Sequence, residues 1–324
     1  MRCAVSLLLL LSLLSLSHGY REPGEEADWC DYEQCKLPDC RCSDTDIPGG
    51  LPVHQIPQIV MVSFDDAVQD RWKADVGNVL SDHKNPNGCP LGATFFASHE
   101  YTSYQTVEEY YSKGYEIASH SISHTPYQDW WKNANETQWH DEIIGMQTII
   151  HEFANIPTDD IQGMRAPLLQ TAGDTTYKMM TNNNLKYDST MPTRRFTDPP
   201  LWPYTLDYKE SKDCQIEPCP VESWPGAWIN VAGLTLFMKE IVDKDDVWII
   251  NVGQAIEWIQ KPTKLSSIFN FAPWSCEAKP PARCTQAQAK WCRYVLDDGQ
   301  ERYMQTCNEK CPPNYPWVGN PKGE

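Results

Sequence analysis

Residues 58–66 read Gln-Ile-Val-Met-Val-Ser-Phe-Asp-Asp, an apolar, β-branched run that ends in two adjacent carboxylates. The run has no helical period, which is typical of a strand buried on both faces of a parallel sheet. Catalytic groups in parallel α/β folds gather at the carboxyl ends of strands, so Asp65 and Asp66 stand where an active site is expected. An acidic turn that only closes the strand is the alternative, and for two aspartates alone it is the better interpretation.

A second stretch shifts that balance towards a metal site. Residues 119–125 read Ser-His-Ser-Ile-Ser-His-Thr and follow another short apolar run, Tyr115 to Ala118. Two imidazoles, His120 and His124, therefore follow one strand, while a carboxylate pair follows another. Imidazoles and carboxylates gathered at neighbouring strand ends can bind a metal ion, so the pattern indicates a metal centre.

The beginning of the chain predicts secretion. Residues 1–19 open with Met-Arg-Cys and continue with an apolar run that is too short to span a bilayer. We interpret them as a signal peptide that is cut near Gly19. The 324-residue chain contains 13 cysteines, and removing Cys3 with the signal leaves 12. An even number in a secreted chain favours disulfides, and Cys214 and Cys219 are close enough in sequence to bridge each other.

Charge restricts the partners. The formal net charge of −17 argues against nucleic acid and against anionic membranes. We expect a soluble, extracellular monomer. Residues 135–137, Asn-Glu-Thr, form a glycosylation sequon that is expected on the surface.

Strands and helices alternate along the middle of the chain. The apolar runs predict strands at 58–64, 93–96, 115–119, 161–164, 185–188 and 247–252, and the periodic segments predict helices at 68–80, 107–113, 136–154, 175–181 and 234–242. For the helix over 107–113, Thr106 and Glu109 form a capping box and Gly114 is the stop signal. The alternation indicates parallel βαβ units in an α/β barrel or open sheet.

The two ends of the chain differ from its middle. Residues 20–57 are rich in Cys and Pro and predict an irregular, disulfide-tied extension, and residues 271–324 predict a Cys- and Pro-rich wrap around the main domain. The domain itself is expected over 58–270, with residues 191–228 forming a long loop rich in Pro and aromatic residues.

Four motifs occur in an order that a known family shares. They are Phe64-Asp65-Asp66, the pair His120 and His124, Arg165-Ala166-Pro167, and the phrase at 201–208, Leu-Trp-Pro-Tyr-Thr-Leu-Asp-Tyr. The chain resembles the metal-dependent polysaccharide deacetylases, a family of carbohydrate esterases. It is most similar to arthropod chitin deacetylases of the short type without a chitin-binding module. The resemblance covers about residues 58–276 and implies a distorted (β/α) barrel.

The resemblance also implies roles for single residues. Asp66, His120 and His124 would bind zinc or another divalent metal, Asp65 would be the general base, and Arg165 would orient Asp65 through an ion pair. The substrate would be chitin or a chitooligosaccharide.

Three further residues are expected to contact the substrate. They are Pro167, Tyr204 and Trp224. The aromatic rings of Tyr204 and Trp224 would stack on sugar rings. Packing in the core of a Trp-rich loop is an equally good interpretation of both.

One part of the family pattern has no counterpart. The family mechanism uses a late His as the general acid, but the last His of this chain is His151, inside a predicted helix. We expect an internal deletion near 230–234, and about six strands instead of eight indicate that one or two late strands are missing. The sequence therefore predicts an impaired N-deacetylase. The alternatives are a non-catalytic, chitin-binding matrix protein and an incomplete splice isoform.

Overall fold

The structure, a computed structural model, describes residues 22–72, 77–196, 198–210, 214–230, 244–276 and 278–324. Three predictions lie outside these residues. They are the signal peptide over 1–19, the helix over 234–242 and most of the deletion site near 230–234.

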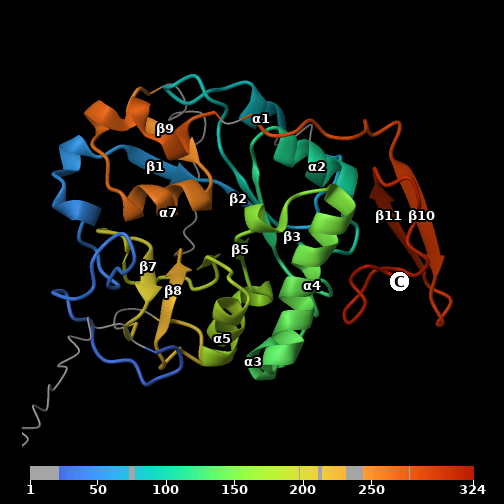
Figure 1. The fold of residues 1–324 in the computed structure, drawn as a ribbon, viewed down its shortest axis with the longest axis horizontal. Coiled ribbons are helices and arrows are strands. Elements are labelled where there is room, and N and C mark those ends of the chain that lie inside the picture. Colours follow the sequence, from blue (N-terminus) through green and yellow to red (C-terminus); the bar gives the residue numbers. More distant parts are fainter. Residues whose placement is uncertain (1–21, 73–76, 197, 211–213, 231–243, 277) are drawn as a thin grey trace, which may run out of the picture.

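The centre of the molecule is a mostly parallel sheet (Figure 1). Its strands follow the order β2-β3-β4-β5-β6-β8-β7, and β9 pairs with β1 in parallel. Only Val62 separates β1 from β2, so β9 extends the order on the β2 side. Every pair is parallel except β7 with β8. The strands are β1 (Gln58–Met61), β2 (Ser63–Asp66), β3 (Thr94–Ala97), β4 (Glu116–Ser119), β5 (Gly163–Met164), β6 (Tyr187–Asp188), β7 (Tyr204–Leu206), β8 (Trp224–Ile229) and β9 (Val247–Ile250).

The prediction of about six strands was too low. All six predicted strands are present, but β7 and β8 lie inside the segment 191–228 that was expected to be a loop. Pro225 and Gly226 occupy the start of β8 and resemble a turn in the sequence, because both residues are rare inside strands. If β1 and β2 are counted as one strand, the described sheet contains seven parallel strands, including β9, and the antiparallel β7.

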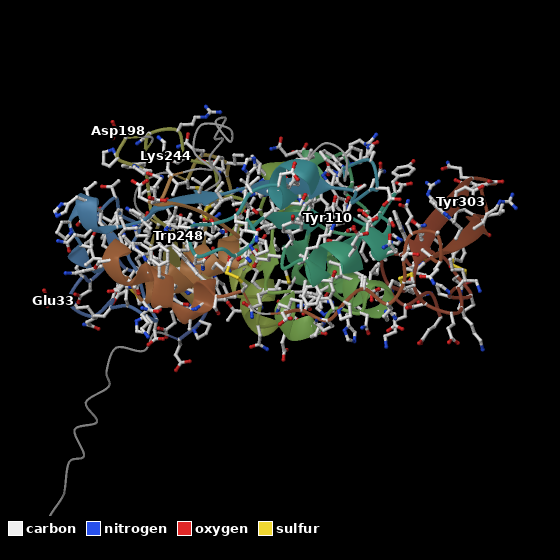
Figure 2. The ribbon with its side chains drawn as sticks, turned by 90° about the horizontal axis from the view of Figure 1, so that it is seen from above. Glu33, Tyr110, Asp198, Lys244, Trp248 and Tyr303 are labelled. Atoms are coloured by element: carbon white, nitrogen blue, oxygen red, sulfur yellow. A yellow bond between two sulfur atoms is a disulfide. The ribbon has the colours of Figure 1, made fainter. Side chains whose placement is uncertain are left out.

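The sheet is curled around a shared core. Phe96 of β3, Tyr187 of β6, Trp228 of β8 and Trp248 of β9 belong to one buried cluster, although β8 and β9 stand near opposite ends of the strand order. Figure 2 shows Trp248 within the body of the molecule. Among the described residues β8 does not pair with β9, so closure of the barrel remains a prediction.

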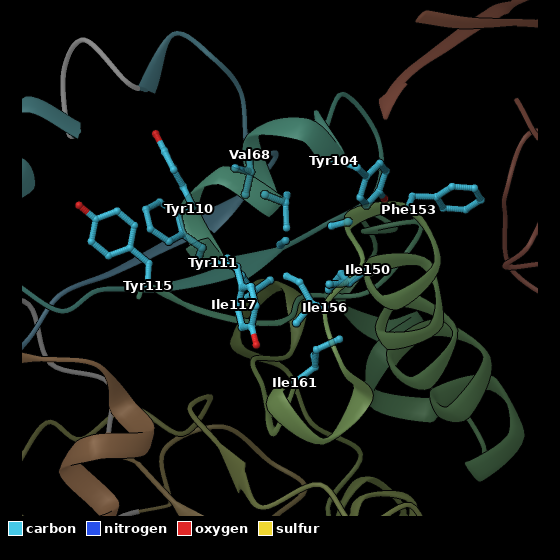
Figure 3. Packing of buried hydrophobic residues seen from close by; sticks show 14 of the residues in the cluster. Val68, Tyr104, Tyr110, Tyr111, Tyr115, Ile117, Ile150, Phe153, Ile156 and Ile161 are labelled. Atoms are coloured by element: carbon cyan, nitrogen blue, oxygen red, sulfur yellow. The ribbon is translucent and has the colours of Figure 1, made fainter. Parts of the chain in front are cut away.

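Helices α2 and α4 pack together and cover one side of the sheet. Tyr104 and Tyr110 from α2 meet Ile150 and Phe153 from α4 in a cluster that also contains residues of β3 and β4 (Figure 3). The helices are α1 (Asn78–Ser81), α2 (Tyr104–Ser112), α3 (Gln128–Asn133), α4 (Glu136–Ala154), α5 (Asp174–Asn182) and α7 (Val252–Gln260). Short 3₁₀ turns are η1 (Pro48–Gly50), η2 (Val53–Gln55), η4 (Thr158–Asp160), η5 (Pro167–Leu169), η6 (Leu265–Asn270) and η7 (Ala272–Trp274).

The helix predictions differ in accuracy. The prediction for 136–154 is confirmed to the residue, with the exposed Asn135 of the sequon as the N-cap. The predicted start of α2 was wrong. The helix begins at Tyr104, because the side chain of Ser103 accepts the backbone N–H of Thr106 and is the real cap.

The extensions are held by disulfides. All twelve cysteines in the described residues are paired, and the predicted Cys214–Cys219 bridge is confirmed. The other pairs are Cys30–Cys42, Cys35–Cys40, Cys89–Cys276, Cys284–Cys307 and Cys292–Cys311. The C-terminal segment was expected to be a disulfide-tied wrap, without strands of its own. It contains instead an antiparallel hairpin of β10 (Lys290–Val295) and β11 (Glu301–Thr306), which carries Tyr303 at one end of the molecule (Figure 2). No helix in the described ranges combines the length and the apolar character needed to cross a membrane.

Candidate metal centre and active site

The motif residues gather at the carboxyl edge of the parallel sheet. Asp66 ends β2, His120 follows β4, Arg165 follows β5, Ser189 follows β6 and Asn230 follows β8. Because neighbouring parallel strands end at the same edge, the topology brings residues more than 160 positions apart into one region. This edge is therefore where the chemistry of the fold is expected.

Asp66, His120 and His124 form a compact ligand cluster. Their ligand atoms all lie within 4.8 Å of one another. Asp66 Oδ1 is 3.7 Å from His120 Nε2 and 3.3 Å from His124 Nε2. Two imidazoles and one carboxylate leave a coordination position open, as in catalytic zinc sites. The donor set fits a divalent metal of the zinc type.

Hydrogen bonding fixes the orientation of the His120 ring. The Nδ1 atom of His120 lies 2.8 Å from the backbone oxygen of Arg165, to which it donates in the tautomer that leaves Nε2 free. Burial lowers the pKa of His120, although the negative charge of Asp65 opposes this shift. A neutral ring presents the Nε2 lone pair to the cluster, which is the form that binds metal.

Asp65, the neighbour of the ligand Asp66 in sequence, is paired with Arg165. Arg165 Nη1 donates to Asp65 Oδ1 at 2.6 Å and to Ser63 Oγ at 3.1 Å. On its other side Arg165 Nε donates to the Ser189 backbone oxygen at 2.7 Å, and Nη2 donates to Ser189 Oγ at 2.9 Å. The guanidinium also lies 4.1 Å from the centre of the Phe96 ring. Four residues thus hold the Arg165 guanidinium in place, and the guanidinium in turn fixes the Asp65 carboxylate.

The backbone at the ligands is unusual. Asp66, Ser121 and His124 all have positive φ, at 75°, 74° and 43°, although none of them is glycine. Such conformations are unfavourable for L-residues and persist where the surroundings fix them. Ser121 Oγ accepts the backbone N–H of His124 at 3.1 Å and closes part of the loop.

The aromatic residues that were expected to contact sugar are buried. Tyr204 and Trp224 are each 3% exposed and belong to the same core cluster, which agrees with the core alternative. Trp224 also begins β8, at the end of the strand opposite to the ligand cluster, and its Nε1 donates to Asp174. Pro167 is buried at the start of η5. These rings therefore present no face to a sugar in this structure.

The sequence predicted Asp65 as a partner of Arg165, and this ion pair is present, but its other partners were missed. Ser63, Ser189 and Phe96 show no motif, and only their positions at or near strand ends could have indicated them. Asn230 was also missed. Its Nδ2 donates to Ser189 Oγ at 3.0 Å, and its Oδ1 is buried without a hydrogen-bond partner in the described part of the chain.

A parallel sheet with an Asp–His–His cluster at its carboxyl edge makes the protein a candidate metal-dependent hydrolase. The profile of the polysaccharide deacetylase family matches residues 54–187. The chain is 34% identical to chitin deacetylase 8 of Bombyx mori over 387 aligned positions, which cover 99% of each protein. It is 31% identical to chitin deacetylase 1 of Bombyx mori, with 91% of this chain and 68% of that protein covered. A solved family 4 carbohydrate esterase from Streptomyces lividans in complex with acetate is 22% identical, with 43% of this chain and 65% of the esterase covered, at a TM-score of 0.34.

The chain belongs to the polysaccharide deacetylase family, and within it to the chitin deacetylases. The members of this family are hydrolytic deacetylases. The resemblance inferred from the four sequence motifs is thereby confirmed.

Proposed function

We propose that the chain is a secreted, zinc-dependent hydrolase that removes N-acetyl groups from chitin or chitooligosaccharides, with a slow turnover. The observation that carries this proposal is the Asp66, His120 and His124 cluster beside an aspartate that Arg165 holds in place. The relatives named as chitin deacetylases support the substrate class, and the paired cysteines agree with secretion.

Different residues of the chain would bind the metal and transfer the proton. Asp66, His120 and His124 would hold the cation, which when bound supplies Lewis acidity towards the carbonyl oxygen of an amide. Asp65 accepts the proton of the attacking water as the new carbon–oxygen bond forms, and the hydrogen bond from Arg165 keeps its carboxylate oriented.

Protonation of the leaving amine is the step that should be slow in this chain. When the carbon–nitrogen bond breaks, the amine needs a proton, and a separate general acid normally gives about 10²–10⁴ in rate. The chain has no His after His151, and the side chain that follows β8 is Asn230, an amide that cannot give up a proton. Asp65 then has to return the proton that it has just accepted.

The alignment supports an internal deletion. The 387 aligned positions with chitin deacetylase 8 exceed the 324 residues of this chain by 63, so at least that many positions have no residue here. In the described residues β8 and β9 are consecutive parallel strands that do not pair with each other. A missing strand would fit between them, where the general acid is expected.

Metal analysis and an acetate-release assay on one preparation test the proposal. We expect about one zinc per chain and turnover on chitin oligomers about 10²–10⁴ below that of a full-length relative. His124→Ala is the control and should lose both zinc and acetate release. A preparation without zinc would refute the metal site, and turnover equal to the relative would refute the slow step. Retention on chitin with zinc bound and no acetate released would support the non-catalytic, chitin-binding alternative.

A further inference from the structure

A carboxylate from outside the motifs anchors the loop that carries both histidines. Glu142 lies on α4, and its Oε2 accepts the backbone N–H groups of Ile122 and Ser123, each at 2.9 Å. Its Oε1 accepts the hydroxyl of Ser123 at 2.5 Å. The three hydrogen bonds hold the middle of the segment between His120 and His124.

Glu142 is placed where a helix normally carries an apolar residue. It is 2% exposed and shares the buried face of α4 with Trp139 and Met146, three residues before it and four after. A carboxylate in such a position is unfavourable unless hydrogen bonds compensate for its lost hydration. A break in the hydrophobic pattern with no benefit to packing is typical of functional sites.

The loop that Glu142 holds needs an external support. Ser121 and His124 have left-handed backbone conformations, on either side of the two residues bonded to Glu142. Such conformations relax unless several contacts fix them together. The helix also approaches the loop closely, since a Cβ added at Gly145 would lie 2.8 Å from Ile122 Cδ1. The bonds to Glu142 and this close packing fix the loop on one face of α4.

We propose that Glu142 is a positioning residue that holds the His120–His124 loop in its metal-binding conformation before the cation arrives. This inference rests on the proposed metal site. Glu142 does not touch the ligand atoms, and it acts through the backbone of Ile122 and Ser123. Loss of its acceptor oxygens leaves the buried N–H of Ile122 and the partly buried N–H of Ser123 without these partners and lets the loop leave its binding conformation. The free energy of that rearrangement then has to be recovered when metal binds.

Zinc affinity of the full chain tests the inference, measured on metal-free protein by competition with a chelator. Replacing the groups around a metal ligand typically weakens metal binding by about 10–100-fold, and we expect this range for Glu142→Ala. Glu142→Gln should remain within about threefold of wild type. Its amide oxygen still accepts both N–H groups, and its NH₂ group can donate to Ser123 Oγ. Ser123→Ala removes one of the three bonds and should weaken zinc binding by about 2–10-fold.

A matched control separates positioning from general stability. Glu136→Ala removes a partly exposed carboxylate from the same helix, where it pairs with Lys178, and should leave zinc affinity unchanged. Thermal unfolding of each metal-free variant identifies any that is only less stable. Wild-type zinc affinity in a folded Glu142→Ala variant would overturn the inference and leave the metal site standing. If Glu142→Ala does not fold, unchanged affinity in Ser123→Ala overturns it. Wild-type protein that binds no zinc overturns both.

Discussion

Two adjacent aspartates provide the sharpest test of the site, because the same substitution should weaken metal binding strongly at one of them and only slightly at the other. Asp66 Oδ1 lies within 3.7 Å of both imidazole Nε2 atoms, whereas Asp65 Oδ1 is bonded to Arg165 Nη1 at 2.6 Å. Asp66→Asn replaces an anionic ligand atom, and Asp65→Asn replaces the partner of a guanidinium. The two substitutions change size and charge equally and differ only in what the carboxylate contacts.

The expected magnitudes follow from those contacts. Loss of a direct ligand should weaken zinc binding more than the loss of a supporting group does, so Asp66→Asn should cost about 100-fold or more. Asp65 is paired with Arg165, which offsets part of the charge lost in Asp65→Asn, so the change should be about tenfold or less. Asp65→Asn should instead lower the free energy of unfolding by about 1 kcal/mol. It converts an ionic hydrogen bond into a neutral one, and the Asp65 side chain is 36% exposed.

Zinc competition and denaturant unfolding of the metal-free proteins measure the two quantities on the same preparations. The assignment predicts that Asp66→Asn loses zinc with little change in unfolding, and that Asp65→Asn keeps zinc and becomes slightly less stable. If Asp65→Asn loses zinc as completely as Asp66→Asn, then Asp65 is itself a ligand and its assignment as the general base is wrong.

Two further predictions concern stability. Burial lowers the pKa of His99 to about 3, so between pH 6.5 and pH 3 the unfolded chain binds a proton that the folded chain does not. Wild type should therefore lose about 3 kcal/mol more than His99→Gln when the pH falls from 7 to 4, and equal losses in urea unfolding would contradict the buried state of His99. The Cys89–Cys276 disulfide closes a separation of 187 residues and Cys214–Cys219 one of only five, so in the chain-entropy model replacing each pair by serine should cost ~5 and ~2 kcal/mol. Equal decreases in the free energy of unfolding would show that loop closure is not the dominant effect.

The sequence was most informative where a pattern and a structural rule coincide. The apolar runs before Asp66 and His120 lack a helical period, and parallel strands end at one edge, so their convergence could be predicted. The expectation that the strand over 58–64 is buried on both faces was wrong, because β1 and β2 are only partly buried. β8 was missed because Pro225 and Gly226 oppose a strand locally, and its pairing with β6 overrides that preference. The hairpin of β10 and β11 was missed although Asp298-Gly299 is a recognisable turn signal.

The hydrogen bonds around the site could not be predicted from the sequence, for a different reason. Glu142 and Ser189 act through hydrogen bonds to loops, and such contacts depend on how a helix or strand end faces its neighbour. Periodicity places Glu142 on a buried face of α4 but gives no partner for its carboxylate. Its burial among apolar residues is the one signal that could have singled it out.

The hydrogen bonds around the metal cluster indicate how the metal ligands and the Asp65–Arg165 pair should respond to the proposed internal deletion. His120 is oriented by the backbone of Arg165, and the loop to His124 is held by Glu142, so both supports come from residues well before β8. Asn230, which follows β8, is linked to Arg165 through Ser189. Asn230 donates to the Ser189 hydroxyl, and the hydroxyl and backbone oxygens of Ser189 accept from the Arg165 guanidinium. A change after β8 would thus reach Arg165, and through it Asp65, without touching a metal ligand. We therefore expect metal affinity to be preserved and proton transfer to be impaired in this chain.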